Sequence, residues 1–256
     1  MRVAITGATS GLGWELAKVY ASKGNSLLLS GRDPDRLEEI SMTCSELGAD
    51  VVSNKIDVTD TQAMESWLTT ADRESPIDVV IANAGLGGAD VMVADHGESS
   101  QLARQIIEVN SIGVFNTVTP LIPKMAKRGA GHIVIIGSIS ALNGLPQSPV
   151  YCASKSALKV YADAIRRLLK PQGVQVTSVL PGFVDTPMSR SIGLPRPWLW
   201  TSEKAAMRIM RDVERGAAHC IFPWQFRFLI GLQNLLPTAI GDQVLRLSIK
   251  LGSGQK

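Results

Sequence analysis

The sequence is poor in features that mark several whole classes of protein. It has three cysteines, Cys44, Cys152 and Cys220, an odd number without the spacing of a metal site, so we expect free thiols in a reducing compartment. The formal net charge is only +3, and we expect no nucleic-acid partner. The composition therefore favours neither a disulfide scaffold nor a nucleic-acid-binding protein.

Long apolar runs and internal boundaries are also missing. No window is apolar enough to cross a bilayer, and no repeat, low-complexity run or Pro/Gly/Ser-rich linker divides the 256 residues. Because a strand is expected to begin at Arg2, no room is left for a cleavable leader, and we expect a cytoplasmic protein. His96, His132 and His219 are scattered without a second ligand at metal spacing, which predicts structural roles and no metal.

The sequence does contain short apolar runs that alternate with helical patterns. Such runs are typical of strands buried on both faces of a parallel sheet, and the alternation is typical of right-handed βαβ units. The expected strands cover residues 2–6, 26–30, 51–56, 78–82, 132–136, 174–180 and 220–222. The pattern predicts an α/β fold, a doubly wound parallel sheet with helices on both faces, and a ligand beyond the carboxyl ends of the strands.

The sequence predicts the N-termini of two helices. Asp33-Pro34 predicts a capping residue followed by proline at the first helical position. The stretch Thr59-Asp60-Thr61-Gln62 predicts a capping box at the start of the next helix.

The first expected strand runs directly into a glycine-rich turn, Gly7-Ala8-Thr9-Ser10-Gly11-Leu12-Gly13, and then into a helix. This layout is typical of a dinucleotide site, because glycines let the backbone approach a pyrophosphate and the helix N-terminus offers free N–H groups. A tight turn that binds nothing is the alternative.

Tyr151 and Lys155 lie four residues apart, so on a helix they face the same way. A free tyrosine has a pKa near ~10, and an adjacent ammonium favours the phenolate. The pair can therefore give a proton to a carbonyl or take one from an alcohol. By itself this spacing is common, and a surface helix that happens to carry both residues is the alternative.

Taken together, these motifs make residues 1–222 similar to the short-chain dehydrogenases/reductases in their single-domain form. The motifs occur in the family's order: Thr6-Gly7…Gly11…Gly13, Asp57, Asn83-Ala84-Gly85, Asn110, Ser138, Tyr151…Lys155 and Pro181-Gly182…Thr186. The resemblance implies a Rossmann-like fold and a hydride transfer between a nicotinamide and a carbonyl or alcohol. Residues 223–256 carry no motif of the family and are expected to be a helical extension of the same domain.

The resemblance also implies four catalytic residues. Tyr151 would be the general acid in reduction and the base in oxidation, and Ser138 would orient the substrate oxygen. Lys155 would lower the pKa of Tyr151 and bind the nicotinamide ribose. Asn110 would kink a helix and hold a water of the proton relay; an asparagine that simply packs in a helix is the alternative.

Cofactor-binding positions follow from the same resemblance. They are Gly7, Thr9, Ser10, Gly11, Leu12, Gly13, Arg32, Asp57, Val58, Asn83, Ala84, Gly85, Tyr151, Lys155, Pro181, Gly182, Val184 and Thr186. Asp57 and Val58 would meet the adenine, and residues 181–186 would hold the nicotinamide. Asp57 as a plain turn residue is the alternative.

The choice between NADP and NAD depends on the end of the second expected strand. Ser30 stands roughly where an NAD-specific site carries an acid, and the guanidinium of Arg32 suits a 2′-phosphate, so NADPH is favoured over NADH. A simple pairing of Arg32 with Asp33 or Asp35 is the alternative. Ser10 is a departure, because many NADP-preferring relatives carry a second basic residue there.

In the family, the region of residues 187–200 forms a mobile lid over the substrate. With Leu142, Leu145 and Phe183 it offers an apolar wall, which suits a bulky or apolar substrate. Trp198 and Trp200 could instead pack the lid on the body. Ser140 neighbours the site without a motif role, and Cys152 is expected to be a packing residue.

Two further apolar surfaces predict partners. The helix over residues 151–169 is apolar on more than one side and is paired across a two-fold axis in the family, so we expect a homodimer or homotetramer. Phe228, Leu232, Leu235 and Leu236 form a helical stripe that Pro237 would end. A second helix is expected over residues 244–251, with Arg246 and Lys250 one turn apart. These helices suit a peripheral membrane contact, a cover over the substrate pocket or a subunit neighbour.

Two other functions fit the sequence less well. A non-catalytic dinucleotide sensor on the same fold would usually lack the Tyr/Lys pair, and the complete set of Asn110, Ser138, Tyr151 and Lys155 argues against it. A sugar-nucleotide epimerase or dehydratase would carry G-x-x-G-x-x-G and a larger C-terminal domain, and we find neither in this sequence.

Overall fold

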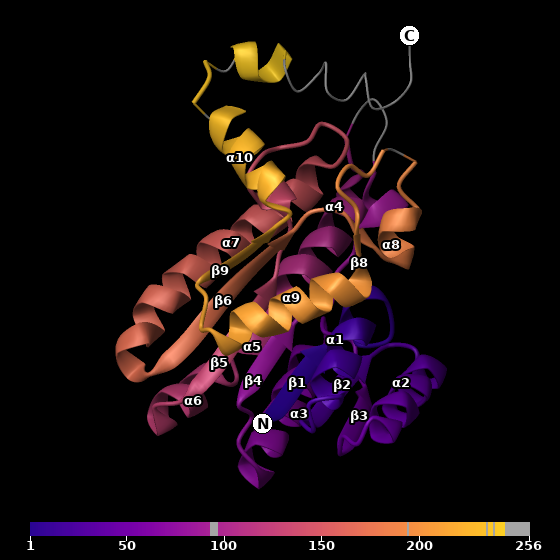
Figure 1. The fold of residues 1–256 in the computed structure, drawn as a ribbon, viewed down its shortest axis with the longest axis vertical. Helices are drawn as coiled ribbons and strands as arrows, with labels where there is room; N and C mark the ends of the chain where they lie inside the picture. Colours follow the sequence, from indigo (N-terminus) through magenta and orange to yellow (C-terminus); the bar gives the residue numbers. More distant parts are fainter. Residues whose placement is uncertain (93–96, 194, 234, 238, 244–256) are drawn as a thin grey trace.

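A parallel sheet forms the centre of the computed structural model, which describes residues 1–92, 97–193, 195–233, 235–237 and 239–243 (Figure 1). Its spatial order, β3-β2-β1-β4-β5-β6-β9, reverses direction between β1 and β4. Its strands are β1 (Arg2–Thr6), β2 (Ser26–Gly31), β3 (Val51–Lys55), β4 (Val79–Ala82), β5 (Gly131–Ile136), β6 (Val174–Pro181) and β9 (His219–Phe222). All neighbouring strands in the sheet are parallel, as predicted. In such a sheet, ligands bind where the strand order reverses.

Helices cover both faces of the sheet, which confirms the doubly wound fold. They are α1 (Gly11–Ala21), α2 (Pro34–Glu46), α3 (Thr61–Glu74), α4 (Ser100–Ile107), α5 (Gly113–Val118), α6 (Ile122–Arg128), α7 (Pro149–Leu169), α8 (Pro187–Arg190), α9 (Ser202–Glu214) and α10 (Trp224–Gln233). One apolar core joins the sheet to α1, α2 and α9, through side chains such as Leu16, Ile40 and Ile209. The other core joins it to α3, α5 and α7, through side chains such as Leu68, Val118 and Leu158.

Two local predictions are wrong. The β3 strand was expected to be buried on both faces, but most of its residues are exposed, because it is the edge strand of the sheet. The expected capping box at Thr59 is replaced by Asp60, whose carboxylate accepts from the backbone N–H of Ala63 at 3.0 Å. Because a residue with a good acceptor lies one position later, the helix begins there. At α2 the prediction is confirmed, since Asp33 caps the helix and Pro34 begins it.

The tail helix α10 rises from the carboxyl end of β9 at the top of the molecule in Figure 1. It begins at Trp224, four residues before the predicted stripe, and ends at Gln233. The second tail helix expected over residues 244–251 lies outside the described residues, as do His96 and Leu194. Within the described part of the chain, no helix is both long and apolar enough to cross a membrane.

Candidate active site

A cavity of about 1030 Å³ opens at the carboxyl ends of the central strands. It is lined by every predicted catalytic and cofactor-binding residue except Gly13 and Asn110, which lie just behind its wall. Residues far apart in the sequence are therefore brought to one surface, as the parallel topology predicts.

The glycine loop is held close to the end of β4. The carboxamide of Asn83 donates to the carbonyls of Thr6 and Gly7 at 3.0 and 3.1 Å, and the hydroxyl of Thr6 accepts from the backbone N–H of Asn83 at 3.2 Å. A Cβ atom built on Gly13 would overlap the carbonyl of Gly7. A side chain at position 13 would therefore push the loop away from α1.

The N-terminus of α1 faces the cavity with its first N–H groups uncapped by a side chain. Ser10 is the N-cap residue, and its hydroxyl makes no capping hydrogen bond. Free N–H groups and the positive end of the helix dipole suit a pyrophosphate. With the close glycine backbone, the loop fits a dinucleotide.

The residue at the end of β2 that would face an adenosine ribose is not Ser30, as predicted, but its neighbour Gly31. Ser30 is fully buried and does not line the cavity, because its side chain points into the interior. Gly31, the next residue, lines the cavity instead, since successive residues of a strand alternate between faces. A Cβ atom on Gly31 would lie 2.5 Å from the Cγ2 of Thr9, so any side chain at this position would require the Thr9 side chain to move.

Arg32 lies at the mouth of the cavity with 66 % of its side chain exposed. Its Nη1 atom is 4.0 Å from the Oδ2 of Asp57. The alternative pairing with Asp33 or Asp35 is not seen among the described residues, because Asp33 caps α2 and pairs with Arg36. Arg36, which the sequence analysis missed, also lines the cavity.

Asp57 combines the two roles that the sequence left as alternatives. Its Oδ1 atom accepts from the backbone N–H and hydroxyl of Thr59, both at 2.9 Å, which makes it a turn residue. It also lines the cavity beside Val58. The carbonyl of Val58 accepts from Asn116 at 2.9 Å, which fixes this loop to α5.

Ser138 begins the short turn η3 (Ile139–Ala141) that follows β5. Its Oγ donates to the Oγ of Ser140 at 3.2 Å and accepts from the backbone N–H of Ser140 at 3.1 Å. Ser140 is therefore part of the site, although it belongs to no motif in the sequence.

Tyr151 and Lys155 face the cavity from the first turns of α7, as predicted. The Lys155 ammonium lies 5.8 Å from the centre of the Tyr151 ring and donates to the carbonyl of Ile136 at 3.3 Å. Burial lowers the pKa of Lys155 from 10.5 to about 8. Burial also raises the pKa of Tyr151, and a hydrogen bond with Ser138 acts in the opposite direction.

The pKa of Tyr151 thus moves opposite to the expected direction. The reason is that loss of water around the phenolate outweighs the hydrogen bond with Ser138, while the Lys155 ammonium donates to the carbonyl of Ile136. A tyrosine held in its protonated form is a proton donor, which suits reduction of a carbonyl.

Asn110 lies in the π-helical turn η2 (Glu108–Ile112), between α4 and α5, so the predicted irregular helix is confirmed. Its side chain is fully buried and bonds Leu86 twice, accepting from the N–H at 2.7 Å and donating to the carbonyl at 3.1 Å. It also donates to the Oγ of Ser154, which in turn donates to the carbonyl of Tyr151. This series of hydrogen bonds connects the segment after β4 with the start of α7.

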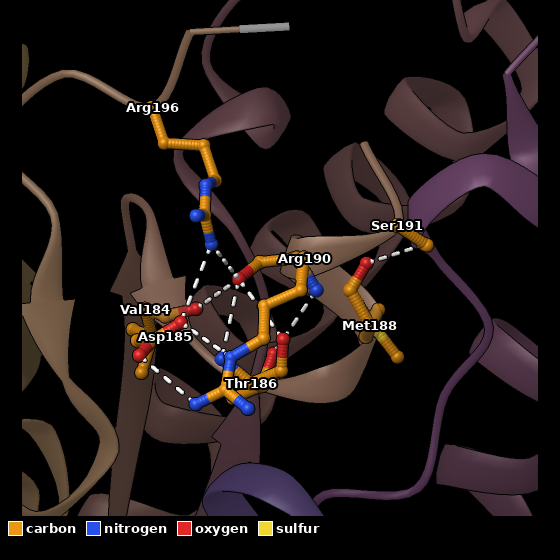
Figure 2. Close-up of polar contacts among 8 residues, drawn as sticks. Val184, Asp185, Thr186, Met188, Arg190, Ser191 and Arg196 are labelled. Carbon is orange, nitrogen blue, oxygen red and sulfur yellow. Dashed lines mark hydrogen bonds and ion pairs between the residues drawn. The ribbon is translucent and has the colours of Figure 1, made fainter. Parts of the chain in front are cut away.

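The predicted lid is fastened at both ends. The two-residue strands β7 (Val184–Asp185) and β8 (Trp200–Thr201) pair with each other, which the sequence gave no sign of. Figure 2 shows Arg190 and Arg196 reaching the same carboxylate, Asp185. Arg190 makes two bonds to it, at 2.8 and 3.0 Å, and holds the pKa of Asp185 below its usual range.

The lid also contacts the segment after β4. The hydroxyl of Ser191 accepts from the backbone N–H of Ala89 and donates to the carbonyl of Met188, both at 2.9 Å. Thr186 lines the cavity and caps α8 through a true capping box with Ser189.

The apolar wall differs in part from the prediction. Leu145 and Phe183 line the cavity, but Leu142 does not. The two tryptophans have different roles: Trp200 stacks on Phe222 in the core, whereas Trp198 lines the cavity and meets Phe226 edge to face at 4.9 Å. Polar side chains that no motif predicts, Asn143, Gln147 and Gln233, complete the wall.

The tail helix supplies one side of this cavity. Phe226, Leu229 and Ile230 line it, and the carboxamide of Gln233 accepts from Asn143 at 3.1 Å. The helix thus borders the pocket, in agreement with one of the three predicted alternatives. All four side chains of the predicted stripe, Phe228, Leu232, Leu235 and Leu236, are nevertheless exposed, and of these Leu232 and Leu236 line the cavity.

The remaining candidates lie outside the cavity lining. His132 is buried, bonds Thr177 at 2.8 Å and has a pKa lowered to about 4, and His219 pairs with Asp163, which fits structural roles. The three cysteines are free and buried. Cys152 packs inside, as predicted, and accepts from the N–H of Leu145.

Comparisons with known proteins agree with this arrangement. The sequence model of the short chain dehydrogenase family matches residues 1–196. An oxidoreductase of Myxococcus xanthus, described as uncharacterized, is 31 % identical over 243 residues, which cover 94 % of this chain and 95 % of that protein.

Solved structures are similar over most of the chain. A short-chain dehydrogenase from Sphingobium yanoikuyae in complex with NADPH has a TM-score of 0.80 at 24 % identity and covers 91 % of this chain and 93 % of its own. An alcohol dehydrogenase from the archaeon Thermococcus sibiricus, complexed with 5-hydroxy-NADP, has a TM-score of 0.76 at 26 % identity and covers 86 % and 95 %.

The buried ammonium of Lys155 predicts a gain in stability when it is removed. Because its folded-state pKa lies below the unfolded value, the unfolded chain binds more protons between about pH 8 and 10.5, and stability rises with pH in that window. We expect Lys155→Met to raise the free energy of unfolding at pH 7 by about 1–3 kcal/mol, since one pKa unit corresponds to about 1.4 kcal/mol. The gain should shrink toward pH 10.5, as measured by urea denaturation.

Lys159→Met, one turn further along α7, is the matched control. It removes a partly buried ion pair with Asp163 and should therefore not raise the free energy of unfolding at pH 7. A Lys155→Met variant that is less stable than the native chain at pH 7 would contradict the prediction.

Proposed function

Because the chain belongs to the short-chain dehydrogenase family, we propose that it is an NADP(H)-dependent oxidoreductase that acts on the carbonyl or alcohol group of a bulky, apolar substrate. The observation that carries the proposal is that Ser138, Tyr151 and Lys155 share one cavity with the glycine loop and the uncapped end of α1. A site for a dinucleotide and a proton donor therefore border the same space.

In the proposed reaction, the bound nicotinamide supplies or receives the hydride. The chain's own residues handle the substrate oxygen. Ser138 orients it, and the Tyr151 hydroxyl gives it a proton in reduction or takes one in oxidation. The raised pKa of Tyr151 keeps the hydroxyl protonated at neutral pH, so it can donate a proton in reduction.

Lys155 and Asn110 support this proton transfer. Lys155 would bind the nicotinamide ribose with donors that its bond to Ile136 leaves free, since an ammonium has three. Asn110 holds the segment of Leu86 against α7, and with Lys155 it closely surrounds Gly85. A proton taken from solvent could reach Tyr151 along this polar wall.

Arg32 supports NADP(H) as the cofactor. The exposed guanidinium stands beside Gly31, a position that carries no carboxylate in this chain, so a ribose 2′-hydroxyl would lack its usual acceptor there. A 2′-phosphate would instead meet Arg32, with Arg36 nearby. The Thermococcus relative binds an NADP derivative, which agrees with this preference.

The lining of the cavity supports a bulky, apolar substrate. Met188, Trp198 and Phe226 come from the lid and the tail helix and extend the wall well beyond Tyr151. Apolar walls with a few polar groups are typical of sites for large hydrophobic ligands.

The proposed chemistry predicts a large effect of one hydroxyl group. Tyr151→Phe removes the proton donor with little change in volume, so kcat for NADPH-dependent reduction in a panel of carbonyl compounds should fall at least ~10²-fold. NADPH binding, measured by fluorescence titration, should be kept.

Tyr161→Phe is the matched control on the same helix. Its hydroxyl is buried, has no hydrogen-bond partner among the residues that the structure describes and does not line the cavity, so turnover should be unchanged. If Tyr151→Phe keeps near-native kcat, the proposed mechanism is wrong; if the native chain binds NADPH but reduces no carbonyl, the sensor function gains support.

The proposed cofactor preference predicts a selective loss. Arg32→Ala should weaken NADPH binding by about 1.5–3 kcal/mol, the range for hydrogen bonds to charged groups, and leave NADH binding nearly unchanged. Arg215→Ala removes an exposed arginine after α9, far from the cavity, and should affect neither. Equal losses for both cofactors would refute the assignment.

We also propose that the chain forms at least a homodimer through α7. Val160 and Leu168 on this helix are 66 % and 63 % exposed, and α4 and η2, which pack against α7, expose Ile107 and Ile112. Adjacent exposed apolar side chains on three elements suit a self-complementary interface.

Light scattering tests the dimer. The native chain should exceed the 27.4 kDa of one chain, and Val160→Glu with Leu168→Glu should shift it toward that mass. Met42→Glu, which changes an equally exposed apolar residue on α2, should leave the assembly intact. A native chain that is monomeric at micromolar concentration would exclude this proposal.

A further inference from the structure

The tail helix α10 carries apolar side chains on two opposite sides. Phe226, Leu229 and Ile230 line the cavity. Trp224 and Phe228, one helical turn apart, do not line it and are 69 % and 63 % exposed. The substrate cavity therefore explains only one side of the helix.

The exposed side is continuous with the mouth of the cavity. Leu232 and Leu236 both line the cavity and reach solvent. Across the mouth, the lid exposes Met188, Trp198 and Leu199, and Trp198 touches Phe226 of α10. We call the exposed apolar side chains of α10 and the lid the mouth surface. Contiguous apolar patches of this kind mark interaction sites on soluble domains.

The charges around the mouth surface include both signs, with a small excess of positive charge in the lid. Among the described residues of 223–243, the charged ones are Arg227 and Asp242, and both are exposed. In the lid, Arg190 and Arg196 share the single carboxylate of Asp185. The lid therefore gives the rim a slight excess of positive charge, which complements a surface of anionic lipid headgroups.

We propose that the mouth surface docks on an anionic lipid bilayer, so that the cavity opens toward the membrane. Trp224 and Phe228 would enter the interface of the bilayer, where aromatic side chains are favoured, and Arg227 would meet the headgroups. Within the described residues no helix can span a membrane, so the contact is peripheral.

The position of the surface argues for a bilayer over a protein partner. Because the exposed side chains surround the mouth, a protein seated there would close the cavity, whereas a bilayer can deliver an apolar molecule into it. Delivery of the substrate from the membrane rests on the proposed function. It names the substrate class as a carbonyl or alcohol compound dissolved in the membrane. Docking itself does not depend on catalysis.

Flotation of the full chain with phosphatidylcholine vesicles that contain phosphatidylglycerol tests the docking. The native chain should float at low salt. Trp224→Glu with Phe228→Glu should reduce the bound fraction at least about tenfold, because two apolar anchors are lost. Met42→Glu with Leu47→Glu adds the same charge at exposed apolar positions on and next to α2, so it should float like the native chain.

Two measurements separate this proposal from its alternatives. Reduction of a water-soluble ketone without vesicles should be equal in all three proteins, since Trp224 and Phe228 do not line the cavity. A long-chain ketone dissolved in the vesicles should be reduced at least about tenfold more slowly by the Trp224/Phe228 variant. A chain that floats but reduces no ketone would refute the proposed function and leave docking supported.

Three outcomes would overturn the docking proposal. The native chain could remain at the bottom of the gradient at low salt. The control variant could lose flotation as fully as the Trp224/Phe228 variant, which would reduce the effect to net charge. Light scattering could show that the Trp224/Phe228 variant alone dissociates an oligomer, which would assign the mouth surface to a second copy of the chain.

Discussion

The carboxamide of Asn83 holds together the two strands on which the site depends. It donates to the carbonyls of Thr6 and Gly7, so the ends of β1 and β4 stay joined at the point where the strand order reverses. The same contact leaves no space for a side chain at Gly13 and positions α1 with its N-terminus toward the cavity. If the two strand ends separated, the glycine loop would lose its shape, and the residues that follow β4 would lose their register with α7.

A second constraint is the burial of polar groups beside this loop. Asn110 and Lys155 have almost no exposed surface, and each is bonded to a backbone carbonyl. Burial disfavours the charged form of Lys155 and the ionised form of Tyr151 alike. Burial of these polar groups therefore lowers the free energy of unfolding but fixes the arrangement of hydrogen-bond donors in the site. The two apolar cores, one on each face of the sheet, offset this loss of stability.

Much of the fold was predictable because the signals are local. Apolar runs identified the strands of the sheet within one or two residues, and Asp33-Pro34 identified a helix start. The burial of β3 was mispredicted because edge position depends on the order of strands in space. The inward direction of Ser30 depends on the phase of one strand relative to the sheet. Ser140, Gln147 and Gln233 join the cavity only through tertiary packing, and a two-residue pairing such as β7 with β8 has no sequence signature. The motif residues met in one cavity as expected, whereas their chemical roles stay predictions.

The two sides of α10 have a consequence for how this protein can change in evolution. Positions 226, 229 and 230 face the cavity, while positions 224 and 228 face outward from the same helix. Mutations on one side alter what the cavity selects, and mutations on the other alter what the surface meets. Because the helical repeat separates the two sets of positions, natural selection can alter the lining of the cavity and the exposed apolar surface independently within the helix Trp224–Gln233.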